Sequence, residues 1–116
     1  MNRLLAPALM AWALAGCAAH RTQLYSWGDY ENVIYRSYAS PGKYPPAMQV
    51  ETLEKDYQTA RAANARMPPG WHAQLGYLYF QLGRTDQARQ EFSTEKAEFP
   101  ESALLMDRLL SHLAPP

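Results

Sequence analysis

Clusters of proline and glycine divide this chain into short stretches, and their positions limit what it can fold into. Such residues crowd positions 40–46 and 67–70, and Gly83 and Pro100 follow further along. Proline interrupts a helix and glycine readily ends one, so a loop or helix end is expected at each place. Between these breaks, apolar residues recur every three or four positions, as in helices, and no convincing strand pair exists. The sequence therefore predicts an all-α fold of about five helices.

Each expected helix is short and has one apolar face. The helices are predicted to cover residues 30–38, 47–65, 71–82, 86–99 and 102–113. Asp29 and Thr85 are suitable N-caps for the first and fourth helices, and Gly83 is a suitable C-terminal cap for the third. From residue 24 on, the chain is thus expected to have an N-terminal aromatic segment, residues 24–46, followed by a helical domain, residues 47–116.

The third and fourth helices contain a spacing similar to that of the tetratricopeptide repeat. Its members here are Leu75, Gly76, Tyr79, Ala88, Phe92 and Pro100. The small Gly76 and Ala88 suit a close crossing of two antiparallel helices, which Tyr79 and Phe92 would fill from the side. Pro100 would end the second helix of the pair. The pattern therefore predicts a tetratricopeptide-like helical hairpin.

Two residues depart from that motif, and a plain helical hairpin remains the alternative. Trp71 lies one position early, and Glu95 stands where a small residue is common. A single repeat cannot bury its own faces, so the helices at 47–65 and 102–113 are expected to flank the hairpin as atypical caps. Stacks of this kind bind proteins or peptides more often than they catalyse reactions.

The first seventeen residues have the parts of a bacterial lipoprotein signal in the right order. Arg3 provides a positive start, and residues 4–14 form an apolar run too short to span a bilayer. The Leu-Ala-Gly-Cys sequence that ends at Cys17 resembles the lipobox. There the cysteine thiol receives a diacylglycerol, the chain is cleaved before it, and the new amine is acylated. An ordinary secretory signal, residues 1–16, with an accidental cysteine is the alternative.

Lipidation at Cys17 would attach the mature chain to a membrane through a short tether, residues 17–23. Ala18 follows the cysteine, where an Asp commonly retains lipoproteins in the inner membrane. We therefore expect an outer-membrane protein with its domain on the periplasmic face, and no cofactor apart from the covalent lipid.

Composition and motifs argue against several other functions. Loss of Arg3 with residues 1–16 leaves ten basic and eleven acidic residues, a net charge of −1. This balance provides no excess of positive charge that would bind nucleic acid. The three histidines, at positions 20, 72 and 112, have no metal-ligand spacing and are expected at the surface. No glycine-rich phosphate loop or nucleophile motif is present, so we expect no metal, no small-molecule substrate and no catalytic residues.

Tyrosines and a tryptophan are concentrated in the N-terminal segment, and they allow two interpretations. Such side chains are enriched at interfaces. Tyr35 and Tyr44, with Arg36 and Lys43 beside them, are the candidate partner-binding residues. The alternative, favoured for one stripe of this segment, is packing against the helical stack; that stripe consists of Trp27, Tyr30, Ile34 and Tyr38.

Three longer stretches resemble a family of small bacterial lipoproteins with a domain of unknown function. They are Leu-Tyr-Ser-Trp-Gly-Asp-Tyr-Glu at 24–31, Pro-Pro-Gly-Trp-His-Ala-Gln-Leu-Gly-Tyr-Leu-Tyr at 68–79, and Glu-Lys-Ala-Glu-Phe-Pro-Glu-Ser at 95–102, with Met106 and Asp107 after them. Members of that family are typically encoded beside a lipoprotein similar to the CsgG curli-secretion pore. The resemblance implies an accessory role in an outer-membrane secretion or surface-assembly complex, and it implies no catalytic residues.

These observations together predict a non-enzymatic protein-interaction adaptor, anchored in the outer membrane, with a protein partner such as a CsgG-like lipoprotein. The alternative is a cell-wall (peptidoglycan)-binding or purely structural envelope lipoprotein that uses its tyrosines on glycan. A hydrolase is the third alternative.

Overall fold

The computed structural model describes residues 22–115, so the predicted signal peptide and Cys17 lie outside the described part. Five α-helices form in this range, with a short 3₁₀ turn, η2, at Pro100–Ser102. They are α2 (Tyr30–Ala39), α3 (Pro46–Ala62), α4 (Trp71–Gln81), α5 (Thr85–Glu98) and α6 (Ala103–His112). Between residues 22 and 115 no strand forms, and Tyr25 and Arg66 make an isolated parallel bridge. The all-α prediction is confirmed, and every helix boundary lies within three residues of the expected one.

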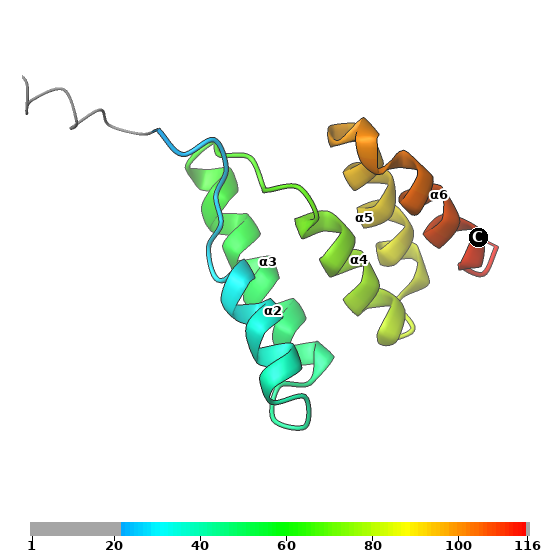
Figure 1. Cartoon of the computed structure of the whole chain (residues 1–116), viewed down its shortest axis with the longest axis horizontal. Coiled ribbons are helices and arrows are strands. Elements are labelled where there is room, and N and C mark those ends of the chain that lie inside the picture. Colours follow the sequence, from blue (N-terminus) through cyan, green and yellow to red (C-terminus); the bar gives the residue numbers. More distant parts are fainter. Residues whose placement is uncertain (1–21, 116) are drawn as a thin grey trace, which may run out of the picture.

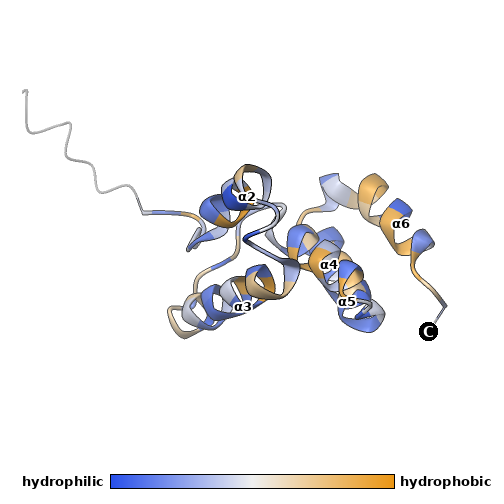
Figure 2. Ribbon diagram, turned by 90° about the horizontal axis from the view of Figure 1, so that it is seen from below, coloured by the Kyte–Doolittle hydropathy of each residue, from blue (hydrophilic) through white to orange (hydrophobic). Residues whose placement is uncertain are grey.

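The helices lie in space in the order of the sequence. Helix α2 lies against α3, α3 packs on α4, and α4 and α5 form the most closely packed pair (Figure 1). Helix α6 packs on α5, and Figure 2 shows apolar residues along much of its length. None of the helices within residues 22–115 combines the length and the apolar character needed to cross a membrane.

Two helices end through the same backbone arrangement, which requires a left-handed residue just after the helix. After α4 this residue is Gly83, with φ of 72°, and the Arg84 N–H donates to the Tyr79 carbonyl at 2.8 Å. After α3 the residue is Asn64, with φ of 51°. The C-terminal cap predicted at Gly83 is therefore confirmed.

Neither predicted N-cap side chain performs that role. Asp29 precedes α2 but makes no side-chain cap bond, and its backbone N–H donates to the Asp56 carboxylate at 2.7 Å. Thr85 lies one residue inside α5, because the helix begins directly after Arg84. Sequence preference identified the helix starts to within one residue. Tertiary contacts, however, determine which groups accept hydrogen bonds from the free N–H groups at those starts.

The core lies between the helices and is centred on α4. Its largest fully buried hydrophobic side chains come from five helices: Val33, Leu53, Trp71, Leu78, Phe92 and Met106. A Cβ atom built on Gly76 would lie 2.7 Å from Cε1 of Phe92, so the Phe92 ring of α5 occupies the space that a larger residue at position 76 would need. The expected close contact of α4 and α5 at Gly76 is confirmed, and the neighbour in contact is the Phe92 ring, which the sequence had placed beside the crossing.

Candidate functional site

The four predicted partner-binding residues lie together but do not form one exposed surface. Tyr35 is 71% exposed on α2, and Lys43 is exposed in the following loop. Tyr44, in contrast, is only 2% exposed, so the exposed position expected for it is corrected. The loop folds back onto α3, where the Tyr44 hydroxyl donates to Oγ1 of Thr52 at 3.2 Å. Arg36 lies over the Tyr44 ring, 3.9 Å from its centroid, and so covers this buried ring.

The aromatic stripe predicted to pack inward is also only partly buried. Tyr30 packs against the core and Ile34 is partly buried, but Tyr38 is 83% exposed. Each step of four residues turns about 40° around a helix, so Tyr38 lies about 80° from Tyr30. The fully buried residue of α2 is Val33, which the stripe did not include.

Tyr38 borders a pocket formed by α2, the loop after it, the start of α3, and α4, which we call the α2–α4 pocket. Its volume is about 370 Å³, and its lining consists of Ile34, Ser37, Tyr38, Pro41, Tyr44, Pro46, Gln49, Gln74, Tyr77, Leu78 and Gln81. None of these side chains carries a charge. The pocket therefore combines tyrosine rings, three amides and apolar side chains.

Gln49 is the most constrained polar residue of this lining. Its side chain is 5% exposed, and its Nε2 donates to the Tyr44 carbonyl at 2.8 Å. Its Oε1 is buried and has no hydrogen-bond partner. An unpaired buried acceptor is unfavourable, so this oxygen would gain from a donor brought to the pocket wall.

Tyr77 connects the α2–α4 pocket to a second, apolar depression of about 50 Å³. This depression is lined by Tyr77, Phe80, Phe92, Leu109, His112 and Leu113. Tyr77 and Phe80 are each nearly half exposed, although they lie on the central helix. Sequence reasoning did not select Tyr77, Phe80 or the glutamines of α4, although they lie outside the apolar stripe that the helix was expected to bury.

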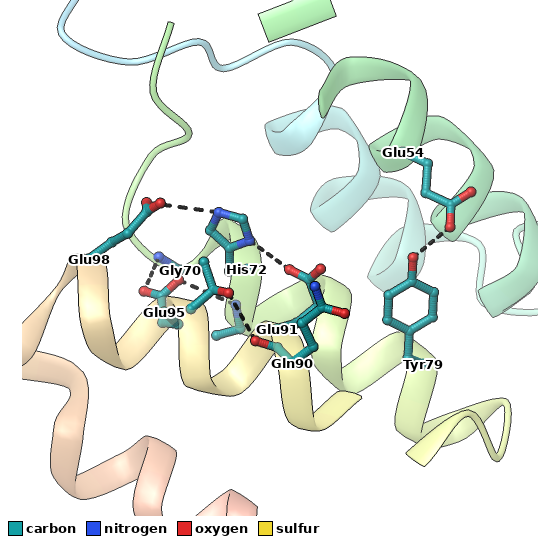
Figure 3. Close-up of polar contacts among 10 residues, drawn as sticks. Glu54, Gly70, His72, Tyr79, Gln90, Glu91, Glu95 and Glu98 are labelled. Carbon is teal, nitrogen blue, oxygen red and sulfur yellow. Dashed lines mark hydrogen bonds and ion pairs between the residues drawn. The ribbon is translucent and has the colours of Figure 1, made fainter. Parts of the chain in front are cut away.

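A third, polar groove of about 450 Å³ lies where α3 and α5 flank α4. In it the Tyr79 hydroxyl donates to Oε1 of Glu54 at 2.5 Å (Figure 3). Burial raises the pKa of Tyr79 strongly, and the hydrogen bond to Glu54 and the charge of Glu91 raise it further. Glu51 and Lys55 also line this groove.

Beside that groove, His72 is buried among the carboxylates of α5, so its expected place at the surface is corrected. The side chain of His72 lies with Nδ1 2.6 Å from Glu91 and Nε2 3.8 Å from Glu98 (Figure 3). The residue is 3% exposed, and its ring lies edge-on to Trp71 and Tyr57. With so little exposure the ring is not open to a substrate, and its contacts join the start of α4 to α5.

Glu95, one turn from Glu91, is buried and accepts two backbone hydrogen bonds at the start of α4. The Gly70 N–H donates at 2.7 Å and the Ala73 N–H at 3.3 Å (Figure 3). Within residues 22–115, no group of three or more histidine, cysteine or acidic side chains has the arrangement of a metal site.

The fold and these surfaces define a small all-α domain, built around a helical hairpin, whose open sites are lined by aromatic, amide and acidic side chains. The chain belongs to the family described as "Domain of unknown function (DUF4810)", which matches residues 24–109. Neither the curated proteins nor the solved structures contain a significant match to it.

Proposed function

We propose that this protein is a lipid-anchored, non-catalytic adaptor that binds a partner protein in an outer-membrane secretion or surface-assembly complex. The observation that carries the proposal is a row of exposed aromatic side chains on α2 and α4: Tyr38, Tyr77 and Phe80. Tyrosine and phenylalanine provide large, rigid contact areas and lose little conformational entropy on binding. Two neighbouring depressions beside this row could receive side chains of a partner.

The order of the helices supports a tetratricopeptide-like stack. Helices α2 and α4 each begin a helical pair, and both contribute to the α2–α4 pocket. Stacked repeats build their extended binding surfaces from equivalent helices in this way. The close contact of Gly76 with Phe92 fits the spacing of that repeat, and α6 would be the helix that ends the stack.

The anchor and the type of partner in this proposal come from the sequence. Cys17 would carry the lipid and hold the domain at the periplasmic face of the outer membrane. The resemblance to lipoproteins encoded beside a CsgG-like protein makes such a pore-related lipoprotein the first partner to test. The neutral α2–α4 pocket and the near-zero net charge agree with binding to protein rather than to nucleic acid.

Site-specific photo-crosslinking of the full-length chain in its native membrane tests the adaptor role. A benzoylphenylalanine in place of Phe80 should capture a defined partner, to be identified by mass spectrometry. The same group in place of Glu101, an exposed residue of η2, is the matched control and should capture much less. Absence of any crosslinked protein from the Phe80 position would contradict the adaptor role.

Two further measurements test the lipid anchor and the cell-wall alternative independently of the crosslinking result. Cys17→Ser should move the protein from the membrane fraction to the soluble fraction and abolish palmitate labelling; a labelled product would contradict lipidation there. Retention of the protein on purified peptidoglycan, together with no captured partner, would favour the cell-wall role instead.

A further inference from the structure

The α2–α4 pocket has a chemistry that selects its occupant. All eleven residues that line it are uncharged, although 19% of the whole chain is charged. A charged group placed there would lose water without gaining an opposite charge, which is unfavourable. The lining of this pocket therefore favours a neutral group over a charged one.

The amides along α4 have a spacing that fits an extended polypeptide. Gln74 and Gln81 both line the pocket, with Tyr77 between them. Seven residues of helix rise about 10.5 Å, and three residues of an extended chain cover about 10 Å. Each glutamine amide both donates and accepts, so it can pair with the N–H and C=O groups of a peptide backbone.

Gln49 adds a requirement for a hydrogen-bond donor. Its Nε2 is committed to the Tyr44 carbonyl at 2.8 Å, which fixes which end of the amide is the oxygen. The remaining Oε1 is buried in the pocket wall and unpartnered. A ligand group with an N–H or O–H would satisfy it, whereas a purely apolar group would leave it unpaired.

We propose that the α2–α4 pocket binds an uncharged, extended peptide segment of the partner protein, whose backbone pairs with Gln74 and Gln81. A residue of that segment with a neutral donor, such as Ser, Thr, Asn or Gln, faces Gln49. This inference rests on the proposed function, because it names the ligand class of the adaptor's own surface. A glycan would also be neutral, but the proposed adaptor role makes a peptide of the partner protein the occupant to expect, and glycan is the competing outcome of the test.

An array of random nonapeptides, probed with the mature, lipidated protein in mild detergent, tests the inference. Bound peptides should contain fewer Asp, Glu, Lys and Arg residues than the array as a whole, and more Ser, Thr, Asn and Gln. Selection of charged peptides, or no selection at all, would overturn the proposal.

Variants of exposed glutamines then locate the site without disturbing the core. Gln81→Glu should weaken binding of a selected peptide about tenfold or more, because the ligand then meets an unpaired charge. Gln58→Glu, in the polar groove between α3 and α5, is the matched control and should change binding less than twofold. Equal affinity for wild type and Gln81→Glu would overturn the assignment of the pocket.

Soluble peptidoglycan fragments serve as the competing probe. Binding of these fragments that Gln81→Glu abolishes, with no peptide binding, would assign the pocket to glycan and overturn the peptide proposal. The adaptor role is judged separately, because a partner captured at Phe80 supports it even if the pocket variants leave peptide binding unchanged.

Discussion

The carboxylate of Glu95, on α5, accepts a hydrogen bond from the backbone N–H of Gly70, at the start of α4, at 2.7 Å. Its second oxygen accepts from the Ala73 N–H at 3.3 Å. The first turn of a helix leaves such N–H groups without partners inside the helix, and a negative charge is favourable there. Glu95 thus caps α4 from a neighbouring helix. This contact explains why a glutamate stands where the repeat pattern favours a small residue.

Replacement of Glu95 should lower the stability of the fold. Glu95→Ala leaves two N–H groups unpaired beside a buried cavity, so we expect the free energy of unfolding to fall by about 2–4 kcal/mol. Glu95→Gln keeps an acceptor and should cost less. Urea unfolding followed by circular dichroism measures both, with exposed Glu101→Ala as a control that should change stability by less than about 0.5 kcal/mol. Equal stability of Glu95→Ala and wild type would show that the cap contributes nothing.

A methyl group at Gly76 should be harmful because of its contact with Phe92. The new Cβ atom would lie 2.7 Å from Cε1 of the Phe92 ring, so Gly76→Ala should destabilise the protein by about 1–3 kcal/mol. A Cβ atom at Gly42 would have no neighbour within 4 Å, so Gly42→Ala is the matched control and should be close to neutral.

A double variant tests whether that contact is the cause. Gly76→Ala should cost less in a Phe92→Leu background than in wild type, because the smaller side chain leaves room for the methyl group. Additive effects of the two substitutions would place the cause elsewhere. Thermal or urea unfolding of wild type, the two single variants and the double variant gives the coupling free energy between positions 76 and 92.

Much of the fold could be predicted because its determinants are local. The breakers at 67–70 and at Gly83 act on the backbone within a few residues, and they placed the boundaries of α4 closely. Gly76 could be interpreted because the repeat spacing named the opposite helix. These features need no knowledge of distant parts of the chain.

The candidate site could not be predicted as well, because it depends on which elements cover which side chains. Periodicity gave a common face to Tyr30 and Tyr38, but only the position of α3 and α4 decides how much of that face is covered. Tyr44 is buried because the loop that carries it folds back onto α3, and in the same region Oε1 of Gln49 has no hydrogen-bond partner. Glu95 meets Gly70 across 25 residues, which no local pattern encodes.

Asp56 should make stability depend on pH in the mildly acidic range. Burial raises the pKa of its carboxyl above 3.8, and the charge of Asp29 raises it too, although the Asp29 N–H bond and Lys55 act in the opposite direction. Because the folded pKa is raised, the folded state binds the proton more tightly than the unfolded state. The stabilisation is fully present below the unfolded pKa and is lost as pH rises through the folded pKa.

Asp56→Asn tests this pH dependence because asparagine keeps an oxygen for the Asp29 N–H but cannot ionise. The stability of Asp56→Asn relative to wild type should therefore rise as the pH increases from 3.8 through the raised pKa of Asp56. Urea midpoints measured across this range give the difference, and Glu101→Gln, at an exposed position, is the control that should show no such rise. A difference that stays constant with pH would contradict the raised pKa.

Tyr79 should keep its proton well above the usual range for tyrosine. Burial raises its pKa above 10.0, and so do its hydrogen bond to Glu54, at 2.5 Å, and the charge of Glu91. The stability linked to this group is fully present below pH 10 and is lost as pH rises through the higher folded pKa, so alkaline unfolding and ionisation of Tyr79 should coincide.

Ultraviolet titration of tyrosine ionisation, compared with circular dichroism, checks this coupling between Tyr79 and Glu54. Tyr79→Phe should reduce the absorbance change that accompanies alkaline unfolding. It should not affect the absorbance change that occurs at lower pH, before the protein unfolds. Glu54→Gln should shift part of the late change to lower pH, because it removes the acceptor's negative charge. Glu51→Gln, which lies in the same groove but makes no bond to Tyr79, should leave the titration as in wild type. If Tyr79→Phe instead removes part of the early change, the hydroxyl titrates in the folded protein and Glu54 does not hold its proton.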